Sequence, residues 1–172
     1  KGYGNCSMDD VVAASGVARY GIYQQFGDKN ALYRAALSRY REQAVTMLNN
    51  ALNTPNGGFS EICDYFASLS ASLEQGDRRG CLASQAAIDR AQDDPQVADI
   101  VAEIMADLRA AFASAVAVGL ARGELRALPP DDLVAFLVGL PRAWATMMRT
   151  ATPADEIQRY SQVSLAMLAS PD

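Results

Sequence analysis

The chain has 172 residues, half of them apolar, and a formal net charge of −5. That length allows a sizeable core and one or two domains. The sequence contains no histidine, which excludes Ser-His-Asp and Cys-His catalysis and histidine-based metal sites. Its three cysteines include no C-x-x-C pair, so we expect no structural zinc or thioredoxin-type site, and a reducing cytoplasm fits best. We therefore expect no cofactor, no metal and no enzyme activity.

Charge is unevenly distributed along the chain. Residues 1–41 carry a net charge of +3, and the remainder therefore carries −8. A basic head on an acidic body is typical of a DNA reader with a separate second domain, and chance clustering is the alternative. The longest apolar run, Leu133 to Leu140, is far short of the ~20 residues that span a bilayer, and no secretory signal is seen. We expect no membrane partner.

The segment from Ser7 to Tyr33 predicts a short helix, a tight turn, a second short helix and the capped start of a third. Ser7 is a good N-cap, and Asp9 and Asp10 follow it where the helix dipole favours negative charge. Gly16 supplies the positive φ that the turn requires. This is the layout of a helix-turn-helix, which places its second helix in the DNA major groove.

The second helix of this motif has one inward and one outward face. Ile22 and Phe26 are four residues apart and point inward. Asp28 is a second N-cap candidate, and Lys29 lies just inside the third helix, where the dipole disfavours a cation and a phosphate is one candidate partner. The outward face carries Arg19, Tyr20, Tyr23, Gln24 and Gln25.

Together these residues resemble the TetR family of bacterial transcriptional regulators. The all-helical remainder is compatible with the divergent ligand-binding domain of that family. The family has a further helix before this motif, and residues 1–4 resemble only its last residues, so we expect a first helix to be missing from this chain. The matching pattern is Ser-Met-Asp-Asp-Val from Ser7, Gly16-Val17, Ile22-Tyr23, Phe26, Lys29 and Leu32-Tyr33.

Helices are predicted throughout the chain, which gives an all-α fold. The third motif helix is expected over residues 28–52, followed by a breaker, Asn-Thr-Pro-Asn-Gly-Gly, at 53–58. We predict a helix-turn-helix DNA-binding domain with its connecting helix at 1–52, and an effector-binding and dimerisation domain at 53–172. Further helices are expected at 59–74, 81–91, 93–121, 131–150 and 154–169.

The last two predicted helices, at 131–150 and 154–169, are unusually apolar. One face of each packs into the body, and the other needs cover. A symmetric dimer in which these helices form a four-helix bundle provides it, and the family resemblance implies the same interface. The alternative is that both faces are internal core.

The resemblance also implies which residues contact DNA. Arg19 and Tyr20 lie near the start of the second motif helix, where Arg19 can pair bidentately with a guanine. Tyr23 and Lys29 match positions that contact phosphates in the family. A solvated arginine and a packing tyrosine are the alternatives. The predicted DNA-binding residues are Ser7, Arg19, Tyr20, Gly21, Tyr23, Gln25 and Lys29.

An effector pocket is expected between the helices of the body. Gln85 is the most informative candidate, because a buried amide in an apolar helix must find a partner. Each of the other candidates is also a normal core residue. The predicted ligand-binding residues are Phe66, Leu69, Leu73, Gln85, Ile88, Met105, Phe112, Trp144, Met147 and Met148.

Cys81 follows Arg78-Arg79-Gly80 at a predicted helix start, and both features lower a thiol pKa. It is either a redox sensor or a small buried hydrophobe.

The favoured function is a dimeric, ligand-responsive regulator that binds a palindromic operator in double-stranded DNA, usually as a repressor, and is released by a small apolar or amphipathic effector. Two alternatives remain open. One is an all-helical enzyme, for which the sequence offers carboxylates but no phosphate loop. The other is a helical interaction module that has lost specific DNA binding.

Overall fold

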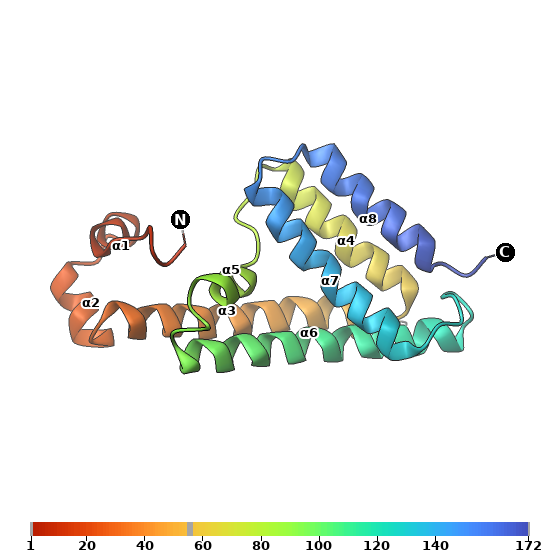
Figure 1. Cartoon of the computed structure of the whole chain (residues 1–172), viewed down its shortest axis with the longest axis horizontal. Coiled ribbons are helices and arrows are strands. Elements are labelled where there is room, and N and C mark those ends of the chain that lie inside the picture. Colours follow the sequence, from red (N-terminus) through yellow and green to blue (C-terminus); the bar gives the residue numbers. More distant parts are fainter. Residues whose placement is uncertain (1, 55–56, 172) are drawn as a thin grey trace. The chain divides into compact units, whose positions relative to one another are not determined.

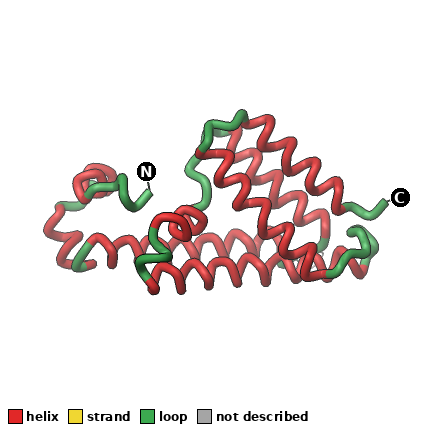
Figure 2. Tube along the Cα trace, in the orientation of Figure 1, coloured by secondary structure: helices red, strands yellow, loops and turns green. Residues whose placement is uncertain are grey.

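The computed structural model describes residues 2–54 and 57–171, and these residues form helices joined by short loops (Figure 1). Figure 2 shows the same chain with helices and loops distinguished. The all-α prediction is confirmed. The helices are α1 (Met8–Ser15), α2 (Arg19–Phe26), α3 (Lys29–Leu52), α4 (Phe59–Glu74), α5 (Leu82–Asp89), α6 (Pro95–Ala121), α7 (Pro130–Arg149) and α8 (Ala154–Leu168).

The predicted helix bounds agree with these to within two residues. α5 ends at Asp89 rather than at residue 91, because residues 90–93 turn back on the helix through amide bonds to Ala86 and Arg90 carbonyls. Lys1, and the part of the predicted breaker at Pro55 and Asn56, lie outside the described residues.

The helices pack into two compact units. The head unit contains Lys1–Gln43 and Leu82–Ile104, and the body unit contains Ala44–Cys81 and Met105–Asp172. Helices α3 and α6 therefore contribute residues to both units. The functional domains at 1–52 and 53–172 stay a prediction about activity, separate from these packing units.

Within the head unit, α1 begins with a reciprocal capping box. The Ser7 hydroxyl accepts a hydrogen bond from the Asp10 amide at 3.1 Å, and the Asp10 carboxylate accepts one from the Ser7 amide at 2.8 Å. α1 ends at Gly16, whose φ of 70° lets its amide donate to the Val12 carbonyl. The predicted cap and turn are confirmed, and they fix the direction in which α2 begins.

A buried carboxylate joins α3 to the start of α6 inside the head unit. The Asp94 carboxylate is 8% exposed and lies 3.1 Å from the Arg34 guanidinium and 3.7 Å from that of Arg90. It also caps α6 by accepting the amides of Gln96 and Val97. Burial opposes ionisation, but the Val97 amide and the Arg34 charge outweigh it and hold the pKa of Asp94 below its usual value.

The body unit has an aromatic and aliphatic core. Phe66 of α4 stacks on Phe112 of α6 with ring centroids 6.3 Å apart, and Tyr65 contacts Phe112 edge-on. Burial raises the pKa of the Tyr65 hydroxyl. A smaller cluster joins Leu73, Trp144 and Ile157 of α4, α7 and α8. These contacts hold α4, α7 and α8 side by side (Figure 1).

Helix α6 is long and apolar enough, by length and composition, to cross a bilayer. Core helices pass the same test, and 39% of its most apolar 18-residue stretch is buried within the protein. Phe112, Ala115 and Val116 belong to the body core.

Two isoleucines test which surfaces hold the fold together. Ile62 is 0% exposed in the body core, whereas Ile88 on α5 is 78% exposed. Ile62→Ala is expected to lower the free energy of unfolding by about 2–5 kcal/mol because it leaves a cavity. Ile88→Ala is the matched control and should change it by less than about 0.5 kcal/mol. Urea unfolding of both variants measures the difference, and equal losses would contradict the core assignment.

Asp94 should make stability depend on acid pH. Its folded pKa is lowered, so its contribution is present above the unfolded carboxyl pKa of about 3.9 and is lost as the pH falls through the lower folded value. Asp94→Asn should therefore melt well below wild type at neutral pH, with the gap closing in acid. Asp93→Asn, at the exposed neighbour, is the control. A gap that stays constant with pH would show that the Asp94 charge does not matter.

Candidate nucleic-acid interface and ligand groove

The exposed surface of α2 carries most of the residues predicted to contact DNA. Tyr20 is 77% exposed and Tyr23 is 40% exposed, while Ile22 is buried and anchors the helix. Gln25 is exposed as well. A Cβ added at Gly21 would meet only the Val17 side chain, at 3.6 Å, so the backbone there is open to close approach. α2 thus presents two aromatic rings and hydrogen-bonding groups, with Arg19 at its start.

Arg19, at the start of α2, is ion-paired with Asp9 of α1. Both side chains are largely exposed, and the side-chain hydrogen bond from the guanidinium to the carboxylate raises the pKa of Arg19. The pair links the two helices of the motif across the Gly16 turn. A base or phosphate that binds the guanidinium has to displace or share the Asp9 carboxylate.

Lys29 has a partner inside the protein. Its Nζ donates to the Tyr3 carbonyl at 2.8 Å and lies 4.2 Å from the centroid of the Tyr3 ring. The Arg90 guanidinium lies 4.5 Å from the same ring, and Tyr33 packs against it edge-on. The sequence indicated that a cation is unfavourable at this helix start, but it did not identify Tyr3 as its partner. Tyr3 lies 26 residues earlier in the chain, and only the fold brings it to Lys29. A phosphate contact by Lys29 stays a prediction.

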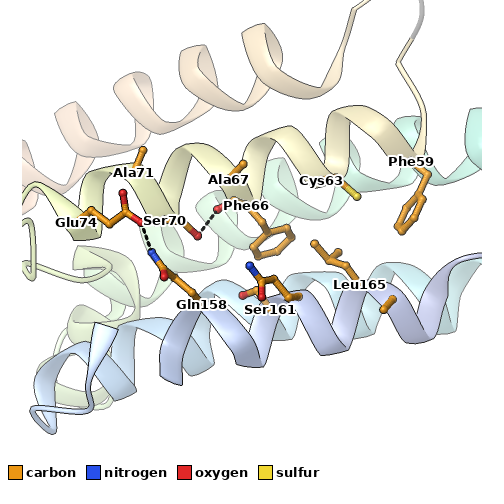
Figure 3. Close-up of a pocket in the computed structure, with 12 residues that line it drawn as sticks. Phe59, Cys63, Phe66, Ala67, Ser70, Ala71, Glu74, Gln158, Ser161 and Leu165 are labelled. Carbon is orange, nitrogen blue, oxygen red and sulfur yellow. Dashed lines mark hydrogen bonds between the residues drawn. The ribbon is translucent and has the colours of Figure 1, made fainter. Parts of the chain in front are cut away.

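The body unit contains a groove of about 510 Å³ between α4 and α8 (Figure 3). One end is polar, where the Gln158 amide donates to the Glu74 carboxylate at 2.8 Å. Ser70 donates to the Phe66 carbonyl within α4. The lining residues are Phe59, Cys63, Phe66, Ala67, Ser70, Ala71, Glu74, Gln158, Ser161, Gln162, Leu165 and Ala166.

Of the predicted ligand-binding residues, Phe66 lines this groove and the others lie elsewhere. Gln85 and Ile88 belong to the head unit, where Ile88 points to solvent. Met105 is half-buried on α6. The remaining six pack in or against the buried clusters of the body unit: Leu69, Leu73, Phe112, Trp144, Met147 and Met148.

Trp144 illustrates why these residues are core. Its indole is 1% exposed, and its N–H donates to the Ser161 hydroxyl, so a buried polar group is satisfied within the protein. The groove residues other than Phe66 were not predicted, because they become neighbours only when α4 packs against α8. The available signal was their spacing of three or four residues along both α4 and α8, which places them on one face of each helix.

Helices α7 and α8 leave an apolar surface uncovered within the described chain. Their other faces contribute Leu133, Leu137 and Ile157 to the buried clusters. The uncovered side chains, which we call the outer apolar face, are Phe136 (43% exposed), Tyr160 (39%), Val163 (60%) and Met167 (63%).

The three cysteines, all among the described residues, form no disulfide and are half-buried. Burial raises the pKa of the Cys63 thiol, which faces the groove. Among residues 2–54 and 57–171, no group of three or more Cys, Asp or Glu side chains is placed to hold a metal ion. A redox role for Cys81 stays a prediction.

Comparison with known proteins places the chain in a family. The tetracyclin repressor-like C-terminal domain matches residues 58–163, and the tetR family of bacterial regulatory proteins matches residues 1–36. YezE of Bacillus subtilis (strain 168), an HTH-type transcriptional regulator, is 26% identical over 170 residues, covering 97% of this chain and 88% of YezE.

Solved structures share the fold. A TetR-family transcriptional regulator from Agrobacterium tumefaciens has a TM-score of 0.85 at 16% identity, over 98% of this chain and 89% of its own. A cysteine mutant of the TetR-family regulator CifR has been solved in complex with 26-bp double-strand operator DNA. Its TM-score is 0.78 at 20% identity, over 97% of this chain and 88% of the CifR chain. Reduced NemR of E. coli has a TM-score of 0.78 at 15% identity, over 98% of this chain and 89% of the NemR chain. The chain described above therefore belongs to the TetR family, and it is a DNA-binding transcriptional regulator rather than an enzyme.

Proposed function

We propose that the protein is a homodimeric repressor that binds a palindromic operator and is released by a small apolar or amphipathic effector. The observation that carries the proposal is the exposed surface of α2, which presents Arg19, Tyr20 and Tyr23. The preceding helix α1 is capped by Ser7 and ends in a turn at Gly16. CifR, which shares the fold, forms a complex with operator DNA, and this supports operator binding by the present chain. The cytoplasm is the proposed location.

The α2 residues take different roles in this proposal. Arg19 and Tyr20 reach base edges from the start of the helix. Gly21 lets the backbone approach the DNA closely, and the Gln25 side chain adds a further contact with the DNA. Ser7, Tyr23 and Lys29 contact phosphates, which position the protein without reading sequence. In the free protein Arg19 is held by Asp9, so a base contact exchanges one acceptor for another.

The outer apolar face supplies the dimer contact. Val163 and Met167 on α8 are the most exposed large apolar side chains of the described body unit, and Phe136 on α7 and Tyr160 on α8 are exposed as well. Two copies of α7 and α8 related by a two-fold axis bury all four in a four-helix bundle. Two-fold symmetry then pairs two motifs with two half-sites, which accounts for a palindromic operator.

Release follows from differential affinity. An effector that binds the DNA-incompetent state more tightly shifts the population toward it, and a coupling of about 1–3 kcal/mol changes operator affinity by roughly 5–150-fold. The body unit offers the α4–α8 groove for such a molecule.

Selection of sequences from a random double-stranded DNA pool, at two salt concentrations, tests the operator proposal. We expect enrichment of a palindrome. Arg19→Ala should relax the preference at one base pair by about 1–3 kcal/mol, whereas Gln24→Ala, on the same helix, should not. Weak, steeply salt-dependent binding with no enriched sequence would indicate phosphate attraction alone and would overturn the proposal.

Substitutions in and beside the outer apolar face test whether it holds the dimer together. Val163→Asp places a charge in the proposed interface and should yield monomers at micromolar concentration, measured by sedimentation equilibrium. Gln162→Glu adds the same charge to the adjacent exposed residue and should leave the dimer intact. A dimeric Val163→Asp variant would show that another surface holds the two copies together.

A further inference from the structure

The groove between α4 and α8 changes character along its length. At one end lie Glu74 and Gln158, and at the other lie Phe59, Cys63 and Leu165 (Figure 3). Phe59 and Glu74 are the two ends of α4, so the groove extends over about 22 Å of helix. A molecule that fills it is elongated and polar at one end.

Small side chains contribute to the groove lining. They are Ala67 and Ala71 of α4 and Ala166 of α8, and the Phe66 ring lies between the two helices (Figure 3). An alkyl or aryl chain lying there removes apolar surface from water, which favours binding. The apolar part of the ligand is therefore a chain or a narrow ring system.

The polar end selects for positive charge. Among the described residues that line the groove, Glu74 is the one carboxylate, and none is basic. Its Oε1 accepts the Gln158 amide, and a carboxylate has capacity for further donors. An ammonium group placed there gains an ion pair, a neutral head gains only a hydrogen bond, and an anionic head is repelled.

We propose that the α4–α8 groove binds an elongated amphipathic cation, with its ammonium head at Glu74 and its apolar chain extending over Phe66 toward Cys63. If the groove is the effector site, the effector is a cation of this class, and that part of the inference rests on the proposed function. Binding of the cation itself does not depend on DNA.

Three probes with one chain and different heads test the charge selection: decylammonium, decanol and decanoate, titrated calorimetrically into the full chain. Decylammonium should bind about fivefold more tightly than decanol, as expected for a solvent-accessible ion pair, and decanoate should bind more weakly than both. Glu74→Gln should abolish the preference for the ammonium head and leave decanol binding unchanged. Glu156→Gln, at an exposed α8 carboxylate outside the groove lining, should retain the preference.

Equal binding of decylammonium and decanol by the wild-type chain would overturn the proposal. A preference that survives in Glu74→Gln would overturn it as well. Ala67→Phe, which fills the groove without altering charge, should abolish binding of all three probes. Unchanged binding by this variant would show that the probes bind elsewhere.

Alkylation of Cys63 tests where the alkyl chain of the bound cation lies. It is 11 residues from Glu74 on α4, about 16 Å along the helix, a distance comparable with a dodecyl chain. In a Cys6→Ser, Cys81→Ser background, dodecylammonium should slow alkylation of Cys63 by iodoacetamide. Labelling is done at about pH 9 because burial raises the pKa of this thiol. Protection should disappear in Glu74→Gln at the same dodecylammonium concentration. An unprotected Cys63 in the saturated wild-type background would exclude the proposed binding pose.

The operator selection separates this inference from the proposed function. Glu74-dependent cation binding without an enriched DNA sequence would support the groove assignment and overturn the repressor role. An enriched palindrome without charge selection at Glu74 would overturn the groove assignment alone.

Discussion

The buried Asp94 carboxylate is the interaction on which the head unit depends. It ends the loop after α5, begins α6 by capping it, and pairs with Arg34 of α3. Removing a carboxylate from water is unfavourable, and the surrounding amides and guanidinium groups make it tolerable. Because α3 begins directly after the helix-turn-helix, this cluster attaches the DNA-facing motif to the start of α6.

The body unit is held together in a different way, by apolar packing in which few polar groups are buried. The Phe66–Phe112 stack and the Trp144 cluster define where α4, α7 and α8 lie. That arrangement gives α8 one surface that faces α4 across the groove and another that no helix of the described chain covers. One lines the groove with Gln158 and Ser161, and the other exposes Val163 and Met167. A single helix therefore serves both the proposed effector site and the proposed dimer contact.

The sequence predicted features that arise from local interactions better than those formed across distance. The Ser7 cap, the Gly16 turn and the Asp28-capped start of α3 were predictable because each depends on neighbouring residues. The groove was not, since it needs the register of α4 against α8, about 90 residues later in the chain. Large apolar side chains such as Trp144 were expected in the pocket, yet their size is what makes them fill the core. The DNA contacts were named from local pattern and family resemblance, and their individual roles stay predictions.

The ion pair between Arg19 and Asp9 has a consequence for the proposed contact between Arg19 and a base. While the guanidinium is occupied by an internal carboxylate, the recognition helix offers less positive charge to phosphates in general. In the proposed function, a guanine in the correct position supplies two acceptors that compensate for the lost Asp9 carboxylate. On that proposal the acidic residue beside α2 is an internal competitor for the guanidinium, and the operator has to offer a better-placed acceptor to displace it.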